Sequence, residues 1–402
     1  MPRVVITGLG MISALGRNVA ENWSSLSAGK PGIGPISSLE TADLKFKNGA
    51  EICGFSPDEH SLKADYLDRF AQLAAVAARE AVTQSGLSFE SGLGDRAAVI
   101  TGSCVGGQTT QDAGFVDLYR KGNSRMHPMC IPRTMANAGA SFISTEHGIR
   151  GPVFTVSTAC SSSNHAMGQA FWLVRSGAVE AAVTGGSEAP FSYGLLKAWE
   201  AMRVVSPDTC RPFSKDRRGL VLGEGAAMLV LESLEHAQAR GAEVLGEIVG
   251  FGMSSDAGHI TKPSPEGAAM AMKAALRDGQ VSPEQVGYIN AHGTGTPLND
   301  STETQAIKLA LGEHARNVAV SSTKSMHGHA LGAAGALEAV ATVLALKCGT
   351  LPPTANFTEP DPECDLDVIP NHAREQKVNC ALSNSFAFGG LNAVLLFHRY
   401  TG

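Results

Sequence analysis

The chain is predicted to adopt an α/β fold built from two similar halves. Short apolar runs alternate along its 402 residues with longer stretches of helix-forming residues, a pattern typical of α/β proteins. A weak internal repeat supports the two halves, because the segments 97–103 and 154–161 are echoed by 287–295 and 319–330. The seam is expected near residues 240–250, which gives an N-terminal domain of residues 1–245 and a C-terminal domain of residues 246–402.

Apolar periodicity predicts the individual elements. Strands are expected at 3–8, 96–102, 153–157, 180–186, 226–232, 286–291, 318–323 and 393–398. Helices are expected at 69–86, 166–177, 267–279 and 335–349. Gly8 and Gly10 follow the first strand, but Ser13 stands where a dinucleotide fingerprint needs its third glycine, so a Rossmann cofactor is not expected.

Composition and charge favour a soluble cytoplasmic protein. A formal net charge of −6 provides no general attraction for nucleic acid or acidic membranes. The sequence lacks a signal-peptide pattern and an apolar run of membrane-spanning length. Its eight scattered cysteines form no CxxC pair and are expected to be reduced thiols.

Cys160 lies between a predicted strand and a predicted helix, in "TVSTACSSSNHAMGQA" (155–170). The positive end of a helix favours a thiolate, so this position suits a nucleophile with a lowered pKa. The alternative is a structural role, because free cysteine is often a small buried hydrophobe.

Histidines follow two other buried strands, at a sheet edge where active sites of α/β proteins gather. They are His292 in "NAHGTGTPLND" (290–300), and His327 and His329 in "SSTKSMHGHALGAAGALE" (321–338). The H-x-H spacing invites a metal, but acidic or sulfur ligands are missing nearby, so no metal is expected and one of these two histidines is incidental. A cysteine with two histidines instead indicates covalent acyl chemistry, in which two neutral rings donate N–H groups to an enolate.

Four segments carry a resemblance to a known family: "TACSSSNHA", "NAHGTGTPLND", "STKSMHGHALGAAGALE" and "SNSFAFGGLN". They resemble the signature blocks of β-ketoacyl-acyl-carrier-protein synthases, type II branch, in the thiolase superfamily. The likeness covers essentially the whole chain and implies a thiolase fold with five α-β-α-β-α layers. Segments 195–214 and 352–378 are most similar to NodE-type nodulation synthases.

The resemblance implies an acyltransferase that elongates fatty acyl chains, including specialised unsaturated ones. Cys160 would accept the acyl chain from acyl carrier protein. His292 and His329 would promote decarboxylation of malonyl-acyl carrier protein, whose carbanion then attacks the thioester. Lys324 and Glu338 would orient the second histidine.

The resemblance also assigns groups that bind the substrate. The backbone N–H groups of Cys160 and Phe388 would form an oxyanion hole, and the Phe388 ring would gate the acyl pocket. Thr294 and Thr296 would bind the phosphopantetheine arm, which arrives on the carrier, so no resident cofactor is expected. Val105 and Cys130 replace the isoleucine and phenylalanine common in the acyl pocket, which predicts room for a longer or kinked chain.

Partners follow from the same resemblance: a homodimer and an acyl carrier protein. The usual basic docking stretch here reads "SLKADYLDRF" (61–70), which adds Asp65 and Asp68 to Lys63 and Arg69. An altered surface for a dedicated carrier is therefore expected. Other basic residues that would serve are Arg120, Lys121, Arg125 and Arg203. Peripheral contact with the inner membrane is compatible with this reading.

Three alternatives remain open at this point. A thiolase shares the fold and the nucleophile, but Cys380 does not fit its second cysteine motif. A non-catalytic partner subunit that sets chain length would lack the nucleophile. An acyl-binding scaffold would need only an apolar pocket.

Overall fold

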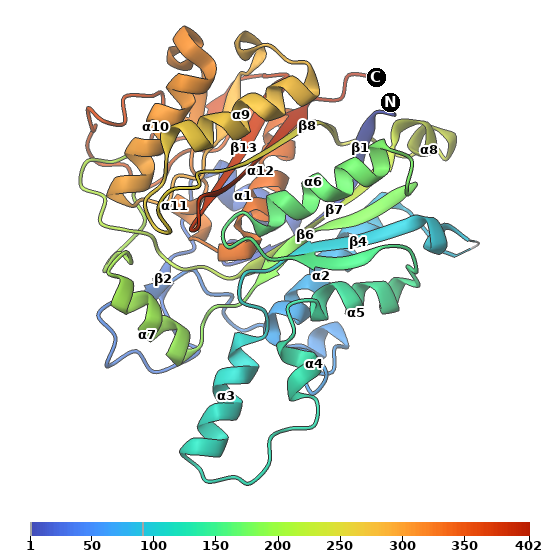
Figure 1. Ribbon diagram of the computed structural model, residues 1–402, viewed down its shortest axis with the longest axis vertical. Helices are drawn as coiled ribbons and strands as arrows, with labels where there is room; N and C mark the ends of the chain where they lie inside the picture. The colour runs from blue at the N-terminus through green and yellow to red at the C-terminus, as the bar shows by residue number, and fades with distance from the viewer. Residues whose placement is uncertain (1, 91) are drawn as a thin grey trace.

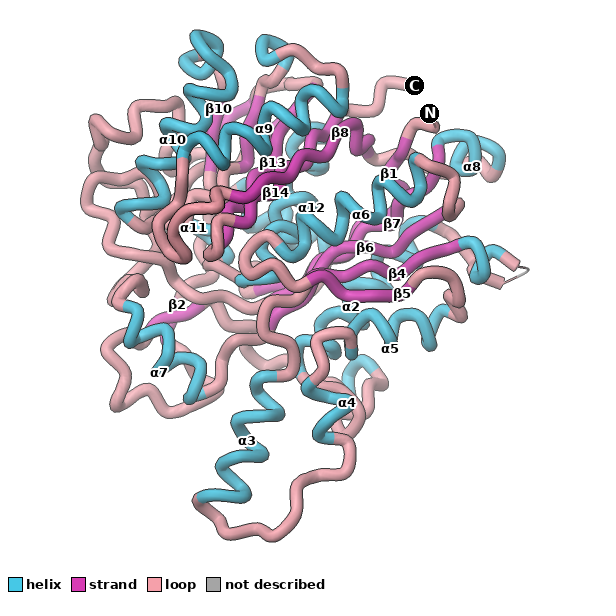
Figure 2. Tube along the Cα trace, in the orientation of Figure 1, coloured by secondary structure: helices cyan, strands magenta, loops and turns pink. Residues whose placement is uncertain are grey.

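The computed structural model describes residues 2–90 and 92–402, and its centre is one ten-stranded sheet (Figures 1 and 2). The strands lie in the order β10-β9-β13-β14-β8-β1-β7-β6-β4-β5. Their bounds are β1 (Val4–Ser13), β4 (Ala97–Gly102), β5 (Val153–Val156), β6 (Ala181–Glu188), β7 (Gly225–Ser233), β8 (Gly246–Ser255), β9 (Tyr288–Asn290), β10 (Ala319–Ser321), β13 (Cys380–Ala387) and β14 (Leu391–His398). Four two-residue strands form separate ribbons: β2 (Gly34–Pro35) with β3 (Asn48–Gly49), and β11 (Thr350–Leu351) with β12 (Arg374–Glu375).

The two halves of the sheet have the same topology. In the first half, β1, β7 and β6 are antiparallel neighbours, and β4 and β5 follow in parallel. In the second half, β8, β14 and β13 are antiparallel, and β9 and β10 follow in parallel. The halves join where β1 pairs with β8 in antiparallel register, from Val4↔Ile248 to Ile6↔Gly246. The predicted fold of two similar halves is therefore confirmed, and β4 and β5 correspond to β9 and β10.

Each half of the sheet forms one layer, and helices form three more: one layer between the two halves and one on each outer face. In the central layer, α6 (Ser162–Arg175) and α12 (Ala334–Cys348) contact each other and strands of both halves. On the outer faces, α2 (Arg69–Ser85) and α5 (Ala138–His147) cover the first half, and α9 (Pro265–Gly279) covers the second with α10 (Pro297–Leu311) packed against it. The other helices are α1 (Val19–Ser27), α3 (Gln108–Tyr119), α4 (Cys130–Thr134), α7 (Tyr193–Met202), α8 (Leu234–Ala239) and α11 (Lys324–His327).

The segment Leu331–Cys348, which contains α12, is long and apolar enough to cross a membrane by length and composition. However, 83% of it is buried inside the protein. Apolar residues occur on all sides of this helix because it packs between the two halves of the sheet.

The glycines of β1 have a packing role. An added Cβ would lie 2.0 Å from the Ala81 carbonyl oxygen at Gly8 and 1.9 Å from the Ala77 carbonyl oxygen at Gly10. Both oxygens belong to α2, so these glycines let the helix backbone pack directly on the strand. The strand also continues to Ser13 instead of turning where a dinucleotide would bind.

Two core strands and one helix start are among the elements that differ from the sequence prediction, and helices such as α5 and α10 were not predicted. β13 was not predicted because its centre is polar, with Ser383, Asn384 and Ser385 all buried. β8 was missed because glycines interrupt its apolar run. Helix α6 begins at Ser162, four residues before the predicted start, since tertiary bonds anchor its polar first turn: Asn164 Nδ2 donates to the carbonyls of β13 and β14.

Candidate active site

The turn that carries Cys160 connects the end of β5 to the start of α6. Ala159 adopts a left-handed conformation with φ 50°, which is strained for a residue with a side chain and is common at functional sites. Two serines hold the turn: the Ser161 hydroxyl donates to the Thr158 carbonyl (2.8 Å), and the Ser162 hydroxyl donates to the Ala159 carbonyl (2.6 Å). The three consecutive serines of the sequence therefore include two that hold the turn at Cys160.

The Cys160 thiol is only 6% exposed, and burial raises its pKa to about 12 despite the nearby Lys324 charge. The expectation of a lowered pKa at the helix start is therefore wrong. Desolvation of the thiolate outweighs the helix end and the lysine, so the resting group is a neutral thiol.

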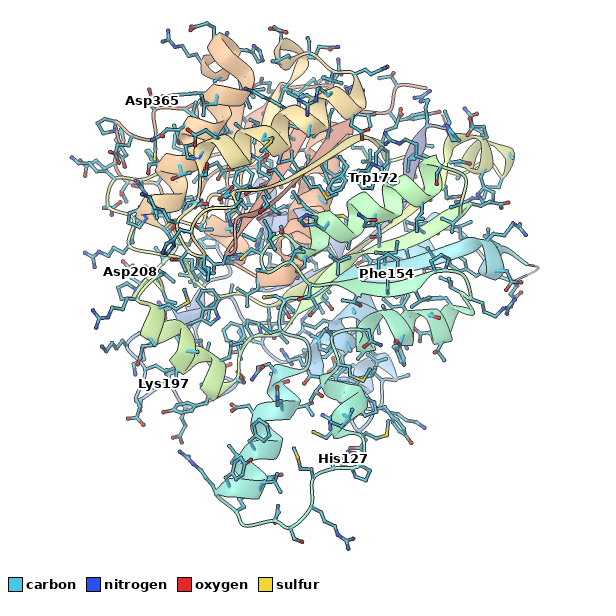
Figure 3. All side chains as sticks on the ribbon, viewed as in Figure 1. His127, Phe154, Trp172, Lys197, Asp208 and Asp365 are labelled. Atoms are coloured by element: carbon cyan, nitrogen blue, oxygen red, sulfur yellow. The ribbon has the colours of Figure 1, made fainter. Side chains whose placement is uncertain are left out.

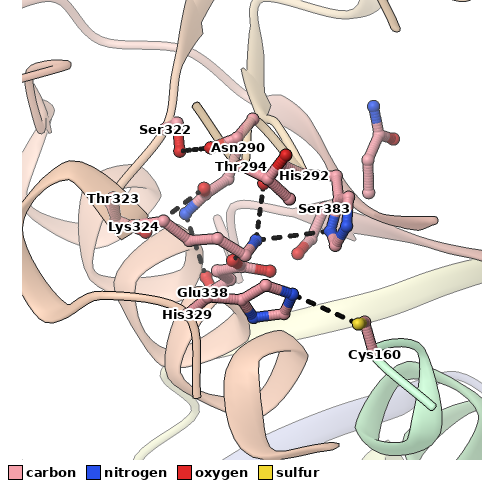
Figure 4. Close-up of polar contacts among 12 residues, drawn as sticks. Cys160, Asn290, His292, Thr294, Ser322, Thr323, Lys324, His329, Glu338 and Ser383 are labelled. Atoms are coloured by element: carbon pink, nitrogen blue, oxygen red, sulfur yellow. Dashed lines mark hydrogen bonds and ion pairs between the residues drawn. The ribbon is translucent and has the colours of Figure 1, made fainter. Parts of the chain in front are cut away.

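His329 occupies the position in the second half that Cys160 has in the first, after the outermost parallel strand and before the central helix. Its Nε2 lies 3.2 Å from Cys160 Sγ (Figure 4). The Leu331 backbone N–H donates to His329 Nδ1 at 3.2 Å. Because Nδ1 accepts that bond, the neutral ring carries its proton on Nε2, the atom that faces the thiol.

His292 follows β9, and a buried lysine positions it. Lys324 Nζ donates to the His292 carbonyl oxygen at 2.6 Å and lies 3.3 Å from His292 Nδ1. The same ammonium group forms a fully buried ion pair with Glu338 of α12. The pair was expected to orient the second histidine, but it contacts His292, the first one, and leaves Nε2 of that ring as the N–H donor.

The two rings form a donor pair beside the thiol. Their centroids are 5.4 Å apart with planes at 85°, and the candidate ligand atoms of Cys160, His292 and His329 lie within 4.8 Å of one another. Burial and the Lys324 charge lower the pKa of both histidines well below the usual value, so both are neutral near pH 7. Two neutral N–H donors next to a thiol can stabilise an oxygen that gains negative charge.

His327, the other histidine of the H-x-H motif, has different partners. Its Nδ1 lies 2.8 Å from the Gly328 carbonyl oxygen and its Nε2 lies 3.0 Å from the Thr323 hydroxyl. Burial lowers its pKa to about 3. It is not among the residues that line the cavity at Cys160, so His329 is the histidine of this motif that faces the thiol.

A cavity of about 320 Å³ opens onto Cys160, His292 and His329. Thr294 and Thr296 also line it, and their hydroxyl oxygens are 2.9 Å apart. Thr296 additionally caps α10.

Phe388 closes another side of this cavity, directly after β13. Its ring stacks on Trp199, with centroids 6.2 Å apart and planes at 27°. Phe388, the residue predicted as the gate, thus lines the same cavity as the Cys160 thiol.

Val105 and Cys130, the two residues predicted for the acyl pocket, do not line this cavity. Val105 is partly buried in an apolar cluster that includes Trp199 and Phe388. Cys130 is buried at the start of α4, in an arm formed by α3 and α4 that projects from the body of the protein (Figures 1 and 3). Of these two residues, therefore, only Val105 packs in the same cluster as Phe388 within one chain.

Two buried glutamates of this region were not identified from the sequence. Glu303 of α10 accepts the backbone N–H groups of His292 (2.8 Å) and Gly293 (2.7 Å), which fixes the histidine loop. Glu188 ends β6 and accepts four hydrogen bonds from two loops. The available signal was a charge at the end of an apolar run, as in "EAAVTGGSE" (180–188).

The charges considered for carrier docking are not equally available. Arg69 pairs with Glu224 at 2.7 Å and lies over the Phe55 ring, so it supports the fold. Asp68 caps α2 and accepts from Thr109. By contrast, cationic side chains gather at the cavity, where the lining includes Arg203, Arg218 and Lys262.

Replacing Lys324 by methionine is expected to lower the free energy of unfolding by about 3–5 kcal/mol, because it leaves Glu338 buried without its charge partner. Lys347→Met is the matched control on the same helix as Glu338, since Lys347 forms an exposed pair with Glu243 that is worth at most about 1 kcal/mol. Urea unfolding of both variants measures the difference. Equal midpoints for the two variants would contradict a stabilising role of the buried pair.

A buried thiol facing two neutral imidazole donors, on a five-layered duplicated α/β fold, defines a cysteine-dependent acyltransferase of the thiolase fold. Models of the β-ketoacyl synthase N-terminal and C-terminal domains match residues 1–237 and 245–358. The chain belongs to the β-ketoacyl synthase family.

Full-length relatives refine this assignment. Nodulation protein E of a Rhizobium species is 50% identical over 99% of both chains. The 3-oxoacyl-[acyl-carrier-protein] synthase 2 of a Synechocystis species is 44% identical over 99% of this chain and 98% of the relative.

Solved structures confirm the thiolase fold. The ishigamide ketosynthase/chain length factor superposes with a TM-score of 0.95 at 40% identity, covering 100% of both chains. A β-ketoacyl synthase from Burkholderia phymatum has a TM-score of 0.92 at 36% identity, again with 100% of both chains covered.

Proposed function

We propose that the protein catalyses the decarboxylating condensation of an acyl thioester with malonyl-acyl carrier protein to give a β-ketoacyl-acyl carrier protein. The observation that carries this proposal is the convergence of Cys160 Sγ and two imidazole N–H donors in one cavity. Relatives named as 3-oxoacyl-acyl-carrier-protein synthases support the carrier protein as the substrate form.

Acylation of Cys160 is the first step. Sγ forms a bond to the acyl carbonyl carbon, the carrier's phosphopantetheine thiol leaves, and the proton of the Cys160 thiol ends on that leaving thiol. The backbone N–H groups of Cys160 and Phe388 are the proposed oxyanion hole, and Thr294 and Thr296 the proposed contacts for the phosphopantetheine arm.

Decarboxylation follows on the malonyl thioester. The bond to the carboxylate breaks, carbon dioxide leaves, and its electron pair forms an enolate whose oxygen is held by His292 and His329. The carbanion carbon then bonds to the acyl carbon, and the Cys160 thiolate leaves and takes up a proton from solvent.

The donor arrangement supports this reaction without a metal ion or a resident cofactor. A histidine that ligates a metal almost always donates its other ring N–H to an acceptor. Here Nδ1 of His329 accepts from a backbone N–H, and Nδ1 of His292 lies against an ammonium group. Both Nε2 atoms therefore carry protons, which suits an enolate oxygen and opposes metal ligation.

The experiment that tests the proposal supplies the purified protein with an acyl primer and malonyl-acyl carrier protein. Mass spectrometry is expected to detect an acyl adduct on Cys160 and a β-ketoacyl product. A relative is named as a ketosynthase/chain length factor, so a non-catalytic chain-length subunit is the second candidate. Absence of the adduct and the product with every carrier would favour that candidate, although this chain retains Cys160.

The acyl chain of the proposed substrate is a specialised one, longer or unsaturated, because Val105 and Cys130 are smaller than the isoleucine and phenylalanine common at these positions. The double variant Val105→Ile with Cys130→Phe is expected to shift the preference toward shorter chains by about tenfold or more, because added methylenes in a pocket change discrimination by that order. Competition between acyl primers of different length measures the shift. An unchanged chain-length profile would rule out these residues as determinants.

A homodimer in the cytoplasm is the proposed state of the protein. The α3–α4 arm exposes large apolar side chains, including Tyr119 (80%) and Ile131 (70%), and the edge strand β5 exposes Phe154 (Figure 3). A partner subunit covering this face would bring Cys130 toward a neighbouring acyl pocket. The cationic groups at the cavity, with Arg203 among them, are the proposed contact for an acidic carrier protein dedicated to this enzyme. Any contact with the inner membrane is proposed to be peripheral.

A further inference from the structure

Glu188 is a completely buried carboxylate at the end of β6 that the proposed reaction does not use. Among the ion pairs of residues 2–90 and 92–402, none involves Glu188. A buried carboxylate without a cation is costly unless hydrogen bonds compensate for its lost hydration. Its partners therefore indicate what it holds.

Two loops supply those partners. On one side, Oε1 accepts from the Ser103 hydroxyl (3.0 Å) and the Val105 N–H (3.2 Å), and Oε2 accepts from the Cys104 N–H (2.6 Å). We call residues 103–105 the acyl-gate loop, because Val105 packs in the cluster that contains Phe388. On the other side, Oε2 accepts from the Gly332 N–H at 3.0 Å.

Gly332 belongs to the His329 turn, residues 329–332. In this turn the Leu331 N–H fixes the proton position of His329, and Leu331 adopts a left-handed conformation with φ 45°. The contact between the turn and the acyl-gate loop is close, since a Cβ on Gly332 would lie 2.4 Å from the Cys104 nitrogen and 2.6 Å from Glu188 Oε2. One carboxylate thus binds the acyl side and the malonyl side of the site at the same time.

We propose that Glu188 is a positioning residue that holds the acyl-gate loop against the His329 turn, and so sets both acyl-chain selectivity and the rate of malonyl decarboxylation. This inference rests on the proposed condensation. The two effects are linked because the same carboxylate holds both segments. Removing its charge weakens several charge-assisted hydrogen bonds together.

The protonation state of Glu188 gives a further readout. Burial raises its pKa to about 7 in spite of the four donors, so the carboxylate is the main form only above neutral pH. The groups that interact electrostatically with this region are the Cys104 and Cys160 thiols, whose pKa values burial raises, and the Lys324–Glu338 pair. Burial also raises the pKa of Glu338 to about 7, so a pH profile needs a variant to assign it.

The test compares the wild-type protein with Glu188→Gln, which keeps the shape of the side chain but places an amide NH₂ against N–H donors. Glu180→Gln is the matched control, because Glu180 immediately precedes the other end of β6 and forms an exposed pair with Arg96. Two measurements are made: competition between a short and a long acyl primer, and carbon dioxide release from malonyl-acyl carrier protein.

Glu188→Gln is expected to change the primer ratio and to slow carbon dioxide release, each by about tenfold, the scale of one hydrogen bond to a charged group. The wild type is expected to select primers more sharply at about pH 8 than at about pH 6, while the Gln variant shows the weaker selectivity at both. A folded Gln variant that matches Glu180→Gln, or that changes only one of the two readouts, would overturn the inference.

Two further outcomes are a Glu188→Gln variant that does not fold and a wild type that forms no product. If Glu188→Gln does not fold, Ser103→Ala decides, because it removes one of the four bonds to Glu188 and leaves the carboxylate in place; it also removes the bond that the Ser103 hydroxyl accepts from the Gly106 N–H within the same loop. A shifted primer ratio in this variant supports the proposal that Glu188 holds the two segments together, and an unchanged ratio overturns it. If the wild type forms no β-ketoacyl product, the proposed function itself fails, which is a different result from a normal wild type with an unaffected variant.

Discussion

Replacing Cys160 by alanine is expected to abolish β-ketoacyl formation, with a loss of at least about 10³-fold, while carbon dioxide release from malonyl-acyl carrier protein continues. The reason is the division of labour that we propose for the cavity: Sγ holds the acyl chain, and the two imidazoles, whose ring nitrogens lie within 4.8 Å of it, act on the malonyl thioester. Product formation and carbon dioxide release are measured on the same samples.

The control for this variant is Cys348→Ala, which removes an exposed thiol at the end of α12. It is expected to keep both activities, so loss of product is specific to Cys160. If Cys160→Ala still formed the β-ketoacyl product, acylation of that thiol would not be part of the reaction. If it lost carbon dioxide release as well, the thiol would be needed for the malonyl half-reaction too.

His292→Ala and His329→Ala are each expected to slow carbon dioxide release by about 10²–10³-fold, the usual effect of removing one oxyanion donor. Both rings are neutral and both direct Nε2 toward the site, so neither is expected to replace the other. Transfer of an acyl group to Cys160 is expected to survive in both variants, since the oxyanion donors proposed for that step are backbone N–H groups. Stopped assays that separate the acyl adduct from carbon dioxide release provide the measurement.

Two comparisons sharpen this second prediction. His329→Gln keeps an N–H donor on a side chain of similar reach and is expected to recover part of the rate that alanine loses. His372→Ala, at an exposed position, is the control for a histidine outside the site. Equal rates of carbon dioxide release in His329→Ala and His372→Ala would remove His329 from the reaction.

The fold was largely predictable because apolar residues determine both the strand and helix periodicity and the internal sequence repeat. Eight of the core strands lie close to apolar runs, and β4 and β5 correspond to β9 and β10 as the internal echo implied. β13 escaped detection for a physical reason: Ser383, Asn384 and Ser385 are buried polar residues. A pattern of apolar residues cannot reveal a strand whose centre is polar.

The site was predictable in its members but not in its electrostatics. The structure brings Cys160, His292 and His329 together, and the motifs pointed to all three because each follows a predicted strand. The pKa of Cys160 depends on how much water the fold removes, which the local sequence does not encode. The contact of Lys324 with His292 also depends on the tertiary fold. The same holds for the four hydrogen bonds to Glu188, whose donors lie far from it in the sequence.

The shared topology of the two halves has a consequence for how the reacting atoms meet. Cys160 and His329 stand at the same place in two copies of one structural unit, each on the turn before a central helix. The distance of 3.2 Å between Cys160 Sγ and His329 Nε2 is therefore set by the way the two copies pack together. They pack through α6 against α12 and through three residue pairs between β1 and β8. A small shift of one copy against the other would separate the nucleophile from the imidazole N–H donor without altering either turn, so the packing between the two halves aligns the reacting groups.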